Sequence, residues 1–194
     1  MALEHDDADS PRAGVRSVAT AIWGFALAIL LIPAIAAWAM RGAAFAFSCA
    51  PSAVSCLRPP YSVLMGSAFK GLLDLSWLMG ATPPLTLGLA AFAALATVFA
   101  LRPVLAALTL LLGPLTALLL PIALVGQTAY DGCAVNENNA GDCVLWGQSM
   151  GDSFHMAATA PELISGYMPF AIAGALVAGL VGWIAQYGAQ RLKH

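Results

Sequence analysis

Four long apolar stretches limit how this chain can fold more than any other feature of the sequence. They cover approximately residues 17–40, 84–101, 104–125 and 167–187, and none contains Asp, Glu, Lys, Arg or His. Each is about as long as the 17–25 residues that a helix needs to cross a membrane core. Charged residues make up only 9 % of the chain, whereas soluble domains carry about 25 %. The sequence therefore predicts an all-α integral membrane protein with four transmembrane helices, forming a single membrane domain over residues 1–194.

The positions of Lys and Arg indicate an orientation, because positive residues favour the cytoplasmic side of a membrane. If both termini are cytoplasmic, Arg12, Arg16, Arg102, Arg191 and Lys193 lie inside, and Arg41, Arg58 and Lys70 lie outside. The first apolar stretch is longer than the apolar part of a signal peptide, which has about 7–15 residues. We therefore expect it to be retained, and we expect periplasmic loops over residues 41–83 and 126–166 of a protein in a bacterial inner membrane.

Residues 61–80 form a further apolar segment, but Lys70 and Asp74 lie near its middle. Each charge would cost about 2.5–3.5 kcal/mol at the centre of a membrane helix. Together with Ser62 and Gly66, the two charges recur every four residues and form a narrow polar stripe on a helix. The pattern predicts an amphipathic helix on the periplasmic surface, with a Lys70–Asp74 ion pair. The alternative is a fifth span, which would place the following loop in the cytoplasm.

The four cysteines lie in the two predicted periplasmic loops, with Cys49 and Cys56 in the first and Cys133 and Cys143 in the second. Cysteine pairs in an oxidising compartment are typical of disulfides. A local disulfide within each loop would restrict its unfolded states and stabilise it by about 2–3 kcal/mol. We predict that all four cysteines form structural disulfides.

A membrane bundle with two periplasmic cysteine pairs also resembles the DsbB-type thiol oxidases, which pass electrons to quinone. In that family, one pair is a vicinal Cys-x-x-Cys beside the start of a helix. Here six residues separate Cys49 from Cys56, and nine separate Cys133 from Cys143. The resemblance covers topology and no motif, with Arg58 placed where a quinone headgroup could be contacted.

Small residues recur on the last predicted span, at Gly174, Ala178 and Gly182. This spacing lets helix backbones approach closely. It fits packing within the bundle, and it also fits docking of a helix from another protein.

The stretch from Met150 to Met156 is a further candidate for chemistry, because Met and His are copper ligands. His155 stands alone between the two methionines, so an ordinary interface residue is the simpler interpretation. We expect no metal and no cofactor. The net charge of −2 gives no basic patch, which makes nucleic acid an unsuitable partner.

These features favour a non-catalytic accessory subunit of a larger inner-membrane complex. Its partners would be membrane lipids and other membrane protein subunits, contacted through the bundle and the disulfide-stapled loops. Two alternatives stay open at this point. One is a quinone-linked thiol–disulfide oxidoreductase, and the other is a lipid or quinone carrier with a bundle kinked at Pro33, Pro114 and Pro121.

Overall fold

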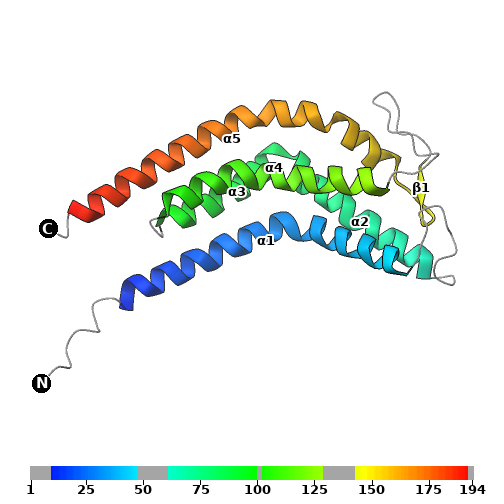
Figure 1. Cartoon of the computed structure of the whole chain (residues 1–194), viewed down its shortest axis with the longest axis horizontal. Coiled ribbons are helices and arrows are strands. Elements are labelled where there is room, and N and C mark those ends of the chain that lie inside the picture. Colours follow the sequence, from blue (N-terminus) through cyan, green and yellow to red (C-terminus); the bar gives the residue numbers. More distant parts are fainter. Residues whose placement is uncertain (1–9, 48–60, 100–101, 129–142, 192–194) are drawn as a thin grey trace, which may run out of the picture. The chain divides into compact units, whose positions relative to one another are not determined.

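The computed structural model describes residues 10–47, 61–99, 102–128 and 143–191, and nearly all of them are helical (Figure 1). The elements in chain order are α1 (Ser10–Ala46), α2 (Tyr61–Ala81), α3 (Pro83–Phe99), α4 (Pro103–Thr128), β1 (Val144–Leu145), β2 (Gln148–Ser149) and α5 (Gly151–Arg191).

Three helices in the described chain are long and apolar enough to cross a membrane, namely Gly14–Ala46 of α1, Pro103–Gln127 of α4 and Gly151–Gly188 of α5. Helices α2 and α3 meet the same criteria only as a pair, which is bent by 76° at the break between them. By length and composition, the described chain thus has three candidate spans, or four if the bent pair is one span. This agrees with the predicted all-α membrane protein.

Helix α5 differs most from its predicted bounds. It begins at Gly151, so residues 151–166 of the predicted loop are helical. The predicted span began at Tyr167, but a helix can continue beyond its apolar part. Asp152 in the first turn favours a helix start, because a carboxylate stabilises the N-terminal end of the dipole. At 1.5 Å per residue the helix is about 60 Å long, twice the membrane core of about 30 Å.

The chain packs as two compact units, and every helix except α2 contributes to both. Unit 1 comprises Met1–Ile29, Leu87–Pro114 and Met168–His194, and unit 2 comprises Leu30–Thr86 and Leu115–Tyr167. Each division falls within four residues of a proline, namely Pro33 in α1, Pro84 in α3, Pro114 in α4 and Pro169 in α5. Proline lacks the N–H that would bond the carbonyl four residues earlier, so α1, α4 and α5 each lose a hydrogen bond near the division. Pro84 lies in the first turn of α3, where no such bond is made.

Unit 1 is built on small side chains. Its core consists of Ala90 and Ala94 of α3 with Ala106 and Leu110 of α4, and Ala175 and Ala178 of α5 pack against it. Alanine leaves room for backbones to approach closely. Helix α1 joins this unit through Trp23, whose Nε1 donates a hydrogen bond to Thr109 Oγ1 at 3.0 Å.

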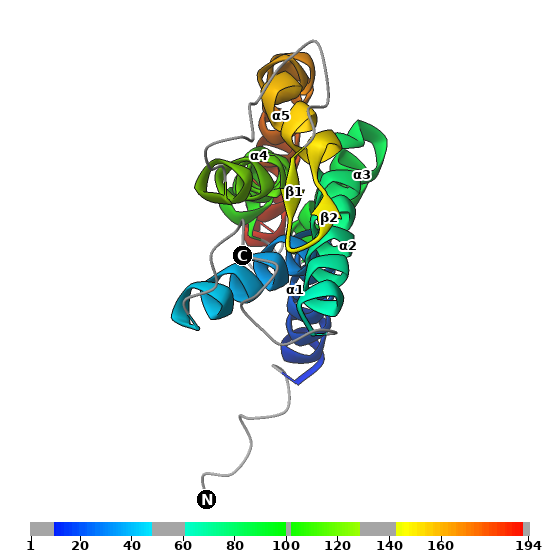
Figure 2. The same ribbon diagram turned by 90° about the vertical axis from the view of Figure 1, so that its right-hand side faces the viewer.

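Unit 2 has a larger and more aromatic core. Phe69, Leu73 and Trp77 form the buried face of α2. The β1–β2 hairpin lies against α2 (Figure 2), and Trp146 and Phe154 are buried with it. Helix α1 joins this unit through Trp38, whose Nε1 donates to Leu120 O at 3.0 Å.

The break between α2 and α3 lies within unit 2 and is capped by side chains. The last carbonyls of a helix have no partner of their own, and such groups are costly in apolar surroundings. The Thr86 hydroxyl lies close to Met79 O and 3.4 Å from Gly80 O. The Tyr167 hydroxyl donates to Gly80 O at 3.2 Å. These two hydroxyls supply donors to carbonyls at the end of α2 inside the unit.

Candidate functional site

One of the four cysteines predicted to form disulfides is described. Cys143 is disulfide-bonded and only 3 % exposed, and its carbonyl accepts a 2.7 Å hydrogen bond from Met150 N. Cys49, Cys56 and Cys133 lie outside the described residues, as does Arg58, so the pairing within each loop stays a prediction. Thiol–disulfide exchange requires an attacking thiolate to reach a sulfur, and the burial of Cys143 restricts that access.

The polar stripe of α2 contacts two other elements. Lys70 Nζ lies 3.3 Å from Asp74 Oδ2, and both side chains are partly exposed. Ser153, in the first turn of α5, donates from its hydroxyl to Asp74 Oδ1 at 3.4 Å. Gly66, one turn before Lys70, is buried beneath the hairpin. The stripe therefore serves partly as a docking surface for the segment that follows Cys143.

The hairpin is anchored by its turn. Leu145 pairs with Gln148 across the two-residue turn Trp146–Gly147, and these two residues have φ of 47° and 76°. Positive φ at both positions is the requirement of a type I′ turn, but it is unfavourable for a bulky residue. The Trp146 side chain is 2 % exposed, and its ring meets Phe69 edge-on with centroids 5.0 Å apart. Burial of this large side chain offsets the backbone cost, since aromatic rings dominate core energetics.

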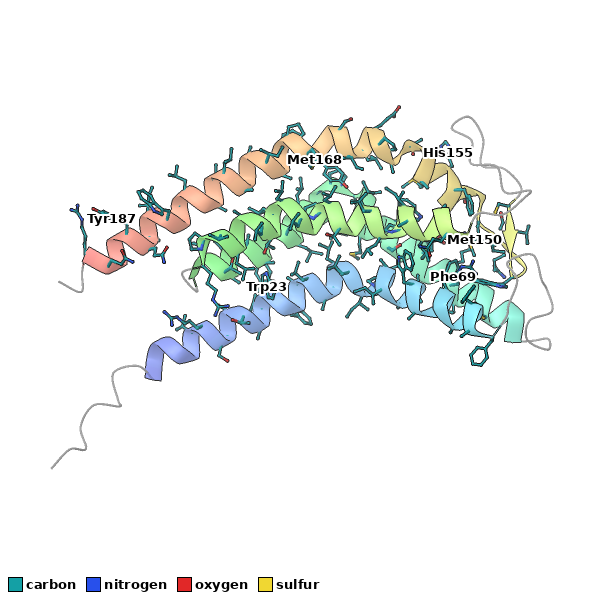
Figure 3. The ribbon with its side chains drawn as sticks, viewed as in Figure 1. Trp23, Phe69, Met150, His155, Met168 and Tyr187 are labelled. Atoms are coloured by element: carbon teal, nitrogen blue, oxygen red, sulfur yellow. The ribbon has the colours of Figure 1, made fainter. Side chains whose placement is uncertain are left out.

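The copper candidate is divided by the fold. Met150 is fully buried at the start of α5, whereas His155 and Met156 are partly exposed. Figure 3 places Met150 and Phe69 where α2 meets the hairpin. No group of three or more His, Cys, Asp or Glu side chains that could hold a metal occurs within the described ranges.

The small-residue ladder of α5 faces α4 in unit 1. A Cβ on Gly182 would lie 2.7 Å from Pro103 Cβ, and one on Gly174 would lie 3.8 Å from Leu110 Cδ1. Ala178 packs on the alanine core of the unit. These three residues thus contact the chain's own bundle and form a narrow seam that joins α5 to α4.

An apolar groove runs beside this seam. It has a volume of about 420 Å³ and is lined by α4 from Pro103 to Leu111 and by α5 from Ile172 to Trp183. Its size lies within the range of about 300–1,000 Å³ that is usual for small-ligand sites. The lining is apolar throughout, so the groove can accommodate a hydrocarbon chain but offers no group for catalysis.

Beyond the groove, α5 carries aromatic and basic side chains at its C-terminal end. The rings of Trp183 and Tyr187 stack with centroids 5.9 Å apart, and Tyr187 is labelled in Figure 3. The Arg191 guanidinium lies 4.8 Å from the centre of the Tyr187 ring and donates to its hydroxyl at 2.6 Å. Such aromatic and basic residues are typical of the membrane–water interface.

The sequence did not predict the hairpin, the groove or the row of Trp183, Tyr187 and Arg191 along α5. Gly147 is the one local signal for the turn, since glycine suits the second position of a type I′ turn. Trp183, Tyr187 and Arg191 recur at every fourth residue, and this spacing was a signal that they lie on one face of the helix.

The structure is thus a helical one in which several helices are long and apolar enough to span a membrane. Comparisons with models of known protein families, with curated proteins and with solved structures found no match.

Proposed function

We propose that this protein is a non-catalytic accessory subunit of a larger complex in a bacterial inner membrane. The observation that carries the proposal is the exposure of α5. Only 11 % of its most apolar 18-residue window is buried, against 28 % for α1 and 50 % for α4. The part of α5 in unit 1 is joined to α4 by one narrow seam, which leaves most of its surface available to lipid or to another subunit.

The outer face of α5 is distinct from the seam and from the groove. On a helix of 3.6 residues per turn, the residues opposite Gly182 project away from α4. They are large and apolar, and they include Val177, Leu180 and Ile184, which are all more than half exposed. A contiguous apolar face of this kind suits packing against a partner's transmembrane helix.

The anchored hairpin supports the same proposal for the periplasmic side. Trp146 packs the hairpin against α2. The disulfide-bonded Cys143 directly precedes β1. A rigid extramembrane segment loses little conformational entropy on binding, which favours its use as a contact surface for partners.

The proposed topology has four spans with both termini in the cytoplasm and α2 on the periplasmic surface. Helix α3 has 17 residues and is about 25 Å long, close to the membrane core of about 30 Å. A bend of 76° lets α2 leave that direction and run along the surface. If α2 and α3 together formed one broken span, α2 would instead lie inside the membrane.

Labelling with a membrane-impermeant maleimide from the periplasmic side tests this topology. Gly71→Cys on α2 and Leu95→Cys on α3 both introduce a thiol at an exposed position. We expect Gly71→Cys to be labelled, Leu95→Cys to resist, and the parent chain to give the background. Equal resistance of both variants would contradict a surface location for α2.

Affinity purification from native membranes in a mild detergent tests the subunit proposal. We expect a stoichiometric set of larger partners in the eluate, identified by mass spectrometry and by its visible absorption. Val177→Trp should remove these partners, because the ring would block a helix packed on the outer face of α5. Val18→Trp is the matched control on α1, since Val18 and Val177 are 60 % and 61 % exposed.

A lone colourless protein with bound quinone would contradict the proposal and favour the thiol–disulfide oxidoreductase. Partners retained by both tryptophan variants would exclude the outer face of α5 as the contact surface.

A further inference from the structure

The groove between α4 and α5 is about as long as one membrane leaflet is thick. Along α5, from Ile172 to Trp183, it extends about 17 Å at 1.5 Å per residue. One leaflet of a membrane core is about 15 Å thick, half of about 30 Å.

The end of the groove at Trp183 carries a specific set of polar groups. Trp183 lines the groove itself, and Tyr187 stacks on it one turn further along α5. Arg191 follows after another turn and folds back over Tyr187. One guanidinium N–H bonds to the Tyr187 hydroxyl, and the others have no partner among the described residues. Arg102 lies directly before Pro103, at the same end of the groove, and is exposed.

This arrangement combines an apolar slot with a cation at one end. An arginine binds phosphate oxygens with several N–H donors at once. Tryptophan and tyrosine rings favour the headgroup level of a membrane. A hydrocarbon chain in the slot would bring a phosphate on its end to the level of Tyr187 and Arg191.

We propose that unit 1 binds one anionic phospholipid, with an acyl chain in the α4–α5 groove and the headgroup phosphate at Arg191. The groove supplies apolar contact to any lipid, and the guanidinium supplies the preference for an anionic headgroup. The inference requires only that unit 1 lies in a membrane, and it is independent of the proposed partners.

Quenching of Trp183 fluorescence by brominated lipids tests the site in vesicles that contain the full chain. Trp183 is 60 % exposed, and the other four tryptophans are buried or partly buried. Subtracting the signal of Trp183→Phe isolates the quenching of this residue. We expect half-maximal quenching at about fivefold lower mole fraction for brominated phosphatidylglycerol than for brominated phosphatidylcholine, the factor that corresponds to about 1 kcal/mol per basic residue near an anionic surface.

Arg191→Gln should abolish this fivefold preference, because the guanidinium favours the net negative headgroup over the zwitterionic one. Arg16→Gln is the matched control, because it removes an exposed arginine from α1, which does not line the groove. Equal quenching by both lipids in the parent chain would show ordinary lipid contact and overturn the proposal. Absence of quenching by either lipid would also overturn it, because a protein surface would then cover the groove.

Discussion

Gly66→Ala is expected to destabilise unit 2 by about 2–3 kcal/mol, the upper part of the range for overpacking a well-packed site. A Cβ at residue 66 would lie 2.4 Å from Trp146 O, 3.2 Å from Trp146 C and 3.1 Å from Gln148 Cγ. The first two atoms belong to the backbone of the hairpin turn, which cannot yield as a flexible side chain can. To make room, the hairpin must move away from α2, and the edge-on contact between Trp146 and Phe69 must open.

Gly71→Ala is the matched control on the same helix, because a Cβ there meets nothing within 4 Å. Alanine is favoured over glycine inside a helix by about 1 kcal/mol, so this variant should be slightly stabilised. Unfolding in detergent with increasing dodecyl sulfate, followed by tryptophan fluorescence, measures both variants. If the two midpoints moved together, the hairpin would not rest on Gly66.

Helices α2 and α4 were the most predictable part of the fold. Helix α4 begins at Pro103, one residue from its predicted start. Proline fits the first turn of a helix better than any later position, so it marks the start. The bounds of α2 were predicted to within one residue from the extent of its apolar segment. These signals lie in residues that are close together in the chain, so the bounds of the two helices can be predicted from the sequence alone.

The hairpin and the groove depend on contacts between distant residues, and local patterns do not encode them. Trp146 adopts a positive φ that its residue type disfavours, and only burial against Phe69 compensates for it. The groove arises where Ile172, Leu176 and Trp183 of α5 fail to fill the space beside α4. In the sequence, these three residues are indistinguishable from ordinary lipid-facing side chains.

The ladder of small residues on α5 was predicted only in part. The sequence identified Gly174, Ala178 and Gly182 as a close-packing face but left open what they pack against. In the fold, Gly182 lies against Pro103, a residue of the same bundle. Any face of α5 that meets a partner must therefore be a different one.

Gly80→Ala is expected to cost about 3 kcal/mol, because it separates two backbones at the end of α2. A Cβ at residue 80 would lie 2.7 Å from Ala117 O, 3.1 Å from Ala117 C and 3.2 Å from Leu118 Cα. Pro121 has no N–H, so Ala117 O lacks its usual donor four residues further along α4. The glycine hydrogen that takes the place of the Cβ points towards this oxygen, an arrangement that recurs at helix–helix interfaces.

The variant would also disturb the capped break, since Gly80 O accepts the hydrogen bond from the Tyr167 hydroxyl. Gly88→Ala provides the control beyond the break, because a Cβ there meets nothing within 4 Å. The same unfolding measurement should give a large loss for Gly80→Ala and a small gain for Gly88→Ala. Equal stability of the two variants would mean that α2 does not approach the α4 backbone, and that the break at Thr82 is not held by this contact.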